Sequence, residues 1–171
     1  MKWAGAAAVA LGLVALLLQL AARSDHWTSV AFDRGAQPGA IRLTLRADAS
    51  VRGWTRWSLP VLVVSCTPAH GVRVAIATQL PVEVEPGLIR TVSLQFDDEP
   101  STIAQWIVER DRETLNAPAP DVAGLASHMV RARRFTIAFV PLHAEPVIAR
   151  FSLAGFGERW AHAAACTRGP A

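Results

Sequence analysis

Alternation of apolar and polar residues with a period of two recurs along most of the chain, and it constrains the fold more than any other feature. In "IRLTLR" (residues 41–46), an isoleucine and two leucines face one way, whereas two arginines and a threonine face the other. This pattern is typical of a strand with one buried face. The same pattern occurs at residues 72–78, 88–96, 102–110, 134–141 and 146–155. The sequence therefore predicts a mainly β (β-rich α+β) fold, a small antiparallel sandwich or curled sheet.

One stretch departs from this alternation. "VLVVSC" (residues 61–66) is a short apolar run that ends in cysteine. Such a run is typical of a central strand that is covered on both faces. The turn signal "TPAHG" follows it directly. We therefore expect residues 61–66 to form a hairpin with residues 72–78.

Two later segments have helical periodicity. In residues 121–133, apolar residues recur at i, i+3, i+7 and i+10 counted from Val122, which places them on one face of a helix. Residues 156–166 fit a second, shorter helix, with Trp160 on its apolar side. We expect two short helices to pack against the sheet, with Trp160 in the core.

The N-terminus has the layout of an export signal. Lys2 precedes an apolar run from Trp3 to Ala22, and small residues close the run. The run is long enough to span a bilayer, so residues 1–23 are expected to be either a cleaved signal peptide or an uncleaved membrane anchor. Both alternatives place the rest of the chain in the periplasm. It would be soluble there, or tethered to the inner membrane through residues 3–22.

The remainder is short enough to be one domain. Residues 24–39 are mixed and polar, and we interpret them as a linker with a short edge strand at Val30–Phe32. Residues 40–167 are predicted to form a single β-rich domain.

The charge balance argues against a nucleic-acid partner. The chain has 17 Lys and Arg residues against 14 Asp and Glu residues, a net charge of +3. Lys2 and Arg23 belong to the N-terminal segment, and removing them leaves 15 basic against 14 acidic residues, a net of +1. No basic cluster is interleaved with aromatic residues, as a nucleic-acid strip would need. The expected partner is another protein of the cell envelope.

The two cysteines, Cys66 and Cys166, allow one internal disulfide bond. Cysteine pairs tend to oxidise outside the cytoplasm, so the bridge is predicted, and it would tie the closing helix to the end of the central strand. The alternative is two buried free thiols. No His/Cys grouping resembles a zinc site.

No pattern predicts a catalytic, cofactor-binding or metal site. The acidic residues 97–99 lack the alternating ligands and the glycine of a calcium loop, and we interpret them as a turn. Each acid in residues 109–113 has an arginine beside it, which is typical of a charge-balanced strand end or loop. The five histidines are not at ligand spacing, and no serine lies in a GxSxG setting. A non-enzymatic accessory or binding protein is therefore expected; the alternative is an envelope hydrolase with an unrecognised active site.

Four neighbouring residues are the candidate partner contact. Trp54 and Trp57 lie in a predicted loop beside Arg52 and Arg56. Trp and Arg are enriched at binding hot spots. The alternative is that both indole rings cover an open end of the sheet.

Several landmarks together resemble the type VI secretion-associated VasI-like family over about residues 40–166. These are a strand ending in Cys66, the "FDDEP" turn followed by Trp106, and the ending "ARFSLAGFGERWAHAAAC". Ser65 stands where the family usually has a basic residue, and Ile107 follows the tryptophan where the family usually has a serine nearby. The resemblance implies a compact β-rich domain in a small exported protein that serves as a periplasmic accessory or binding module, associated with type VI secretion. It supplies no catalytic residues.

Overall fold

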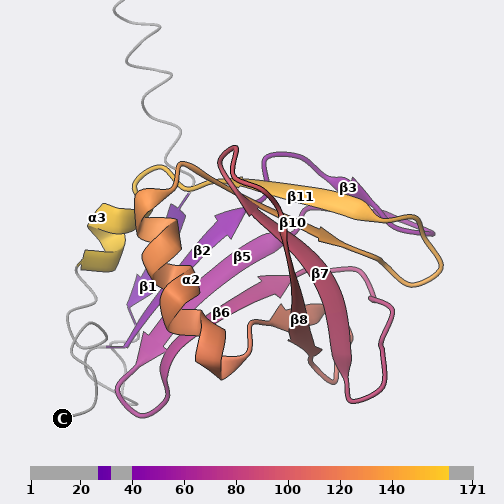
Figure 1. Ribbon diagram of the computed structural model, residues 1–171, viewed down its shortest axis with the longest axis horizontal. Helices are drawn as coiled ribbons and strands as arrows, with labels where there is room; N and C mark the ends of the chain where they lie inside the picture. Colours follow the sequence, from indigo (N-terminus) through magenta and orange to yellow (C-terminus); the bar gives the residue numbers. More distant parts are fainter. Residues whose placement is uncertain (1–26, 32–39, 162–171) are drawn as a thin grey trace, which may run out of the picture.

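A computed structural model describes residues 27–31 and 40–161, which form one large antiparallel sheet and two helices (Figure 1). The order of strands in the sheet is β1-β2-β5-β6-β9-β8-β7-β10-β11, and β3 and β4 form a separate two-residue ladder. The mainly β fold predicted from the alternation is confirmed. In chain order the elements are β1 (Trp27–Ala31), β2 (Ile41–Arg46), β3 (Val51–Arg52), β4 (Trp57–Ser58), β5 (Val61–Thr67), β6 (Gly71–Ala77), β7 (Ile89–Phe96), β8 (Thr102–Val108), β9 (Thr114–Asn116), α2 (Ala119–Arg131), β10 (Arg134–Phe139), β11 (Val147–Ser152) and α3 (Phe156–Ala161).

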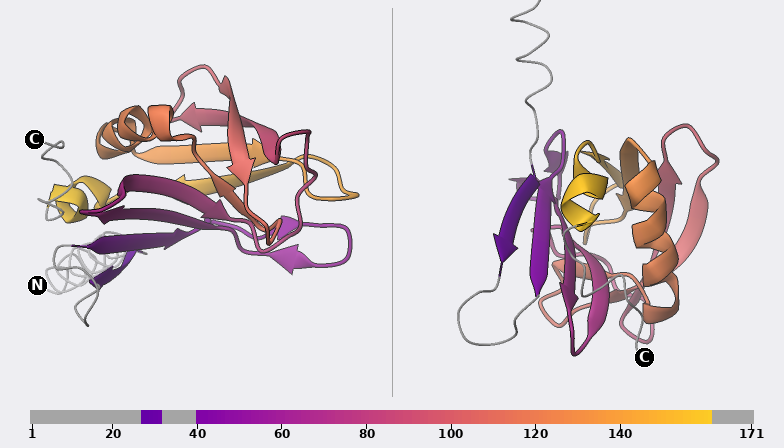
Figure 2. Two further views of the ribbon diagram at one scale, coloured as in Figure 1. Left: turned by 90° about the horizontal axis from the view of Figure 1, so that it is seen from below. Right: turned by 90° about the vertical axis from the view of Figure 1, so that its left-hand side faces the viewer.

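The sheet folds back on itself, so that its two halves enclose the core. Figure 2 shows β1 and β2 on one side of the molecule and β7 and β8 on the opposite side. Asp48, which follows β2, reaches the last strand: its backbone N–H donates to the Arg150 carbonyl at 2.8 Å, and its carboxylate accepts from the Ser152 N–H at 3.3 Å. The far edge of the sheet therefore meets the loop after its second strand, as in the predicted curled sheet.

Aromatic side chains fill much of the interior. Phe96, Phe135 and Phe151 lie directly opposite one another on three neighbouring strands. Their ring centroids are 5.0 and 6.1 Å apart, within the range in which aromatic pairs stabilise a core by about 0.5–1.5 kcal/mol beyond area burial. Trp106 and Trp160 are also buried. The prediction that Trp160 belongs to the core is confirmed.

The two helices close one end of the curled sheet. α2 begins directly after Pro118, two residues earlier than expected, because proline is well accommodated at a helix start. It buries the predicted apolar face against the core. In α3, the Phe156 ring lies 5.1 Å from the Trp27 ring at the start of β1. This contact docks the C-terminal helix beside the first described strand.

One expectation about the strands is wrong. Leu62, Val64 and Cys66 of β5 are buried, but the alternate residues of the same strand are only partly buried. The strand is therefore covered on one face, because the other face belongs to the outer surface of the sheet. In addition, the structure contains a strand, β9, that the sequence pattern did not predict.

Some predictions fall outside the described residues. The N-terminal segment 1–23 is one of them, and Cys166 is another. Cys66 lies in the core near the end of β5, and its bridge to Cys166 stays a prediction. β1 comes from the predicted linker 24–39 and is an edge strand of the described sheet. It begins at Trp27, three residues before the edge strand expected at Val30–Phe32. Within residues 27–31 and 40–161, no helix is long and apolar enough to cross a membrane.

Candidate binding surfaces

The two loop tryptophans point into solvent. Trp54 is 69% exposed and Trp57 is 65% exposed, whereas Trp106 is 1% exposed. The rings therefore do not bury themselves over the end of the sheet. Large aromatic side chains that stay exposed at neighbouring positions are a feature of contact surfaces.

The loop that carries these rings is held by its own backbone. Arg52 pairs with Trp57 in the β3–β4 ladder, and the Gly53 N–H donates to the Arg56 carbonyl at 2.8 Å. A Cβ atom at Gly53 would lie 2.7 Å from the Leu80 side chain, so glycine allows the loop to approach the sheet closely. The indoles are thus presented from a fixed support.

Arg56 belongs partly to that support. Its guanidinium donates to the Glu113 carboxylate at 2.9 Å and to the Gln79 carbonyl at 2.6 Å. Sequence reasoning missed Glu113 as its partner because the two residues are far apart in the chain. Arg52 has no ion pair among the described residues, so it is the arginine of the pair that is available to a partner.

A shallow hollow adjoins Trp54. Its volume is about 660 Å³. Its lining contains one basic residue, Arg52, and two acidic residues, Glu83 and Glu145. The His143 ring meets Trp54 edge-on, with ring centroids 5.5 Å apart. An aromatic centre with a mixed polar rim is typical of a protein–protein contact.

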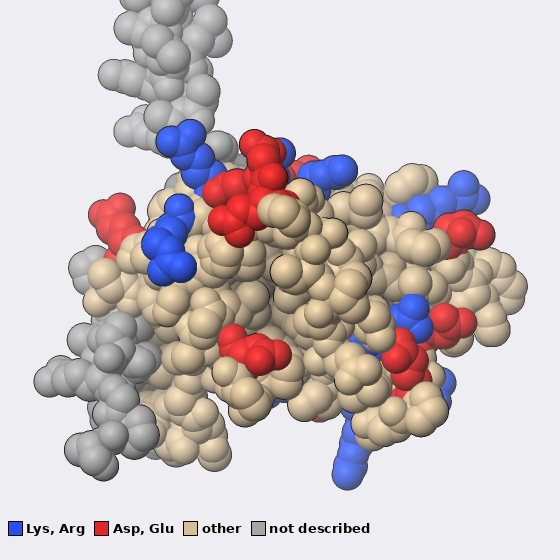
Figure 3. Space-filling view, viewed as in Figure 1, with Lys and Arg blue, Asp and Glu red and all other residues tan. Residues whose placement is uncertain are grey.

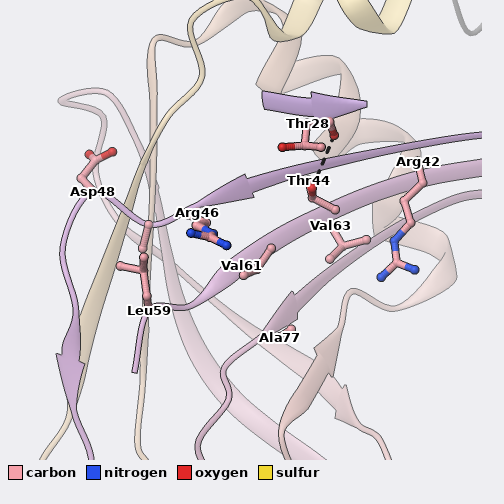
Figure 4. A pocket seen from close by; sticks show the side chains of 10 residues that line it. Thr28, Arg42, Thr44, Arg46, Asp48, Leu59, Val61, Val63 and Ala77 are labelled. Atoms are coloured by element: carbon pink, nitrogen blue, oxygen red, sulfur yellow. Dashed lines mark hydrogen bonds between the residues drawn. The ribbon is translucent and has the colours of Figure 1, made fainter. Parts of the chain in front are cut away.

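A second hollow of about 840 Å³ lies on the outer face of β2, β5 and β6. Figure 4 shows Arg42 and Arg46 reaching over this face from β2, with Val61 and Val63 between them and Thr28 beside Thr44 at the edge. A smaller hollow of about 290 Å³ adjoins it and shares Arg42, Val63 and Ala77. We call the two hollows together the arginine groove. The sequence placed both arginines on the solvent face of β2, but not beside a groove.

The acidic run at residues 109–113 balances its charge through distant arginines. Glu109 pairs with Arg73 of β6, and Glu113 pairs with Arg56. The Asn116 amide also donates to Glu109, at 2.7 Å. The segment connects β8 to β9, in keeping with the expected strand end or loop, but the arginines that pair with Glu109 and Glu113 are not their neighbours in sequence.

Two carboxyl groups have a lowered pKa, and each fixes a turn. The backbone N–H of Thr91 is the largest influence on Glu85 and lowers its pKa against the opposing effect of burial. Burial tends to raise the pKa of Asp111, but hydrogen bonds from the Thr114 hydroxyl and from two backbone N–H groups lower it overall. A general acid at neutral pH needs a raised pKa, so neither carboxyl is suited to that role.

The histidines in the described part of the chain stand apart from one another. His128 stacks on Phe96, with ring centroids 4.0 Å apart, and lies 3.2 Å from the Glu99 carboxylate. His143 lies beside Trp54, and His70 lies in an exposed turn. Among the described residues, no three His, Cys, Asp or Glu side chains are grouped to hold a metal ion. On the face in Figure 3, acidic and basic side chains are intermixed, and neither sign forms a continuous patch.

Comparison with known proteins identifies the fold. No protein-family model matches the sequence, and no curated protein matches it. The fold is similar to the crystal structure of invasion associated protein B from Bartonella henselae, with a TM-score of 0.52 and 11% sequence identity. The match covers 83% of this chain and 94% of that chain. At this identity the likeness extends to the fold alone.

Proposed function

We propose that this protein is a non-enzymatic binding protein of the bacterial cell envelope, and that it contacts another envelope protein through Trp54, Trp57 and Arg52. Arg56 shapes the same surface through its bonds to Gln79, which follows β6, and to Glu113, which precedes β9. The observation that carries this proposal is the exposure of both indoles on a loop with a hydrogen-bonded backbone. A loop whose backbone is already hydrogen-bonded loses less conformational entropy on binding, which favours its use as an anchor.

One further point supports an envelope location. The N-terminal 23 residues have the layout of an export signal. A role in the periplasm, soluble or tethered through residues 3–22, is consistent with this layout.

The contact surface is tested by crosslinking in the intact envelope. A photoreactive amino acid at position 57 should crosslink to a discrete partner, whereas the same amino acid at position 103 should not. Ile103 is a suitable control because it is 70% exposed on β8. Equal crosslinking from both positions would contradict the proposal.

The double substitution Trp54→Ala with Trp57→Ala should weaken binding to the crosslinked partner by about 30-fold or more if the rings are hot spots. Its melting temperature should stay close to that of the wild type, because both rings are largely exposed. Ile103→Ala should change neither property. Loss of folding in the double variant would instead assign the rings a structural role.

The narrower form of the proposal is a role in type VI secretion, which rests on the resemblance around Cys66 and Trp106. Deletion of the gene should lower type VI secretion by the producing cell. The wild-type chain should restore secretion, and the Trp54→Ala/Trp57→Ala variant should not. Unchanged secretion after deletion would contradict the role in type VI secretion. The wider proposal of an envelope binding protein would not be affected.

A further inference from the structure

The strand register places an arginine at each end of an apolar floor in the arginine groove. Arg46 lies opposite Val61, and Arg42 lies opposite Ser65, with the pair Thr44 and Val63 between them. Residues four positions apart on a strand lie on the same face, about 14 Å apart. The groove is therefore a strip of that length with a positive charge near each end.

These two charges are not used within the described structure. Arg42 and Arg46 are exposed, and neither has an ion pair among residues 27–31 and 40–161. Arg73, at the far side of the smaller hollow, is different, because it pairs with Glu109 and donates to the side-chain amide oxygen (Oδ1) of Asn116 at 2.7 Å. The Asp48 carboxylate at the rim accepts a hydrogen bond from β11. Among the described residues, Arg42 and Arg46 thus leave two unpaired positive charges on the floor of the groove, whereas the Asp48 carboxylate places one negative charge at its rim.

We propose that the arginine groove binds an extended acidic segment of a partner protein, whose carboxylates at positions i and i+4 meet Arg42 and Arg46. An extended peptide has the same repeat as β2, so these two side chains point to the same side about 14 Å apart. The side chain at i+2 then lies over Val61 and Val63. The hydroxyls of Thr28 and Thr44 line the edge. The Thr44 hydroxyl donates to the Thr28 carbonyl at 3.4 Å and can still accept a bond from a peptide N–H, and the Thr28 hydroxyl can bond to the peptide backbone.

The shape of the groove favours a peptide over other anions. A flat bilayer surface does not fill a hollow of about 840 Å³ in a curved sheet. A single-stranded nucleic acid stacks its bases on aromatic side chains, and the lining of both hollows contains none. This proposal goes beyond the proposed function, because neither Trp54 nor Trp57 lines the groove.

The test uses two fluorescein-labelled peptides of identical composition. The first, Gly-Glu-Thr-Val-Thr-Glu-Gly, has its glutamates four positions apart and its valine midway between them. The second, Gly-Glu-Thr-Val-Glu-Thr-Gly, has them three positions apart, so that they point to opposite sides when extended. Fluorescence anisotropy with the full chain, purified from the envelope in a non-ionic detergent, should show at least about fivefold tighter binding of the first peptide. Salt should weaken this binding, because the charges are exposed.

Protein variants assign the binding to the groove. Arg42→Gln and Arg46→Gln should each weaken binding of the first peptide by about fivefold. Both side chains are exposed, so the variants should melt like the wild type. The matched control is Arg131→Gln, which removes the same charge from an exposed position at the end of α2 and should leave binding unchanged. The Trp54→Ala/Trp57→Ala variant should also bind the peptide normally, which separates this site from the proposed partner contact.

Equal binding of the two peptides, or normal binding by an Arg42→Gln/Arg46→Gln double variant, would overturn the proposal. It is also overturned if neither peptide binds. In that case, a loss of affinity of the double variant for phosphatidylglycerol vesicles, relative to phosphatidylcholine vesicles, would identify a lipid headgroup as the occupant.

Discussion

Asp97 and Arg134 are joined by a reciprocal pair of hydrogen bonds that closes the connection between α2 and the sheet. The Asp97 carboxylate accepts from the Arg134 N–H at 2.9 Å, and the Asp97 N–H donates to the Arg134 carbonyl at 3.1 Å. The same carboxylate accepts from the Arg133 N–H at 3.0 Å. One side chain in the turn after β7 therefore fixes the point where the chain leaves the helix and enters β10.

Replacing Asp97 with alanine should lower the free energy of unfolding by about 2 kcal/mol, because hydrogen bonds to a charged group are lost. Asp97 also has φ of 45°, a conformation that alanine tolerates less well than aspartate or asparagine. Urea denaturation measures the change. Asp98→Ala is the control, because the Asp98 side chain is 97% exposed, and it should shift stability by no more than about 0.5 kcal/mol. Similar effects of the two substitutions would contradict this assignment.

Gly124→Ala should stabilise the protein by about 0.5–1 kcal/mol. Gly124 lies inside α2, where glycine is less favourable than alanine, and a Cβ atom there would meet nothing within 4 Å. Gly157 in α3 provides the contrast, because its Cβ would lie 3.3 Å from the Val130 carbonyl oxygen. Thermal melting of the two alanine variants should rise for position 124 and should not rise for position 157. A rise at both positions would mean that the two helices pack less closely than described.

Acidification should remove a stabilising contribution from Asp111. The pKa of Asp111 is lowered in the folded state, so the unfolded chain binds the proton more readily. The contribution is therefore present above the ordinary aspartate pKa of about 3.9 and is lost as the pH falls through the lower folded value. Urea midpoints of the wild type and Asp111→Asn should converge between about pH 5 and pH 2. A constant difference across that range would show that the turn does not depend on the charge.

Reduction should lower the melting temperature strongly if Cys66 is bridged to Cys166. The loop closed by this bond would contain roughly 100 residues, for which the chain-entropy model gives a stabilisation of about 4.7 kcal/mol at most. Calorimetry with and without dithiothreitol measures the difference. The Cys66→Ala/Cys166→Ala variant should melt like the reduced protein and should no longer respond to dithiothreitol. Alkylation of both thiols in native, unreduced protein would contradict the bridge.

The alternation in the sequence was sufficient to place most strands. One face of each strand is buried, so apolar residues recur at every second position. The β7 residues Val92, Leu94 and Phe96 all face the core, as predicted. β9 could not be found in this way. It is only three residues long, and it is a strand because it pairs with β6 on one side and β8 on the other. Its own three residues therefore do not predict a strand, and the two neighbouring strands determine its structure.

The binding surfaces show the same limit. The residue types around Trp54 suggested a contact, but the exposure of the two rings is seen only in the folded chain. The arginine groove needed the pairing of β2 with β5 and the curvature of the sheet. A local sequence pattern predicts neither the strand pairing nor the curvature, because both depend on segments that are far apart in the sequence.

The bonds from Asp48 to β11 affect how copies of this protein can associate. They occupy the outward carbonyl of Arg150 and the outward N–H of Ser152, which an incoming strand from another molecule would need. A second molecule would have to displace both bonds before it could extend the sheet there, and edge protection of this kind is how β proteins avoid fibre growth. A single aspartate in a loop thus shields this part of the β11 edge from pairing with a strand of another molecule.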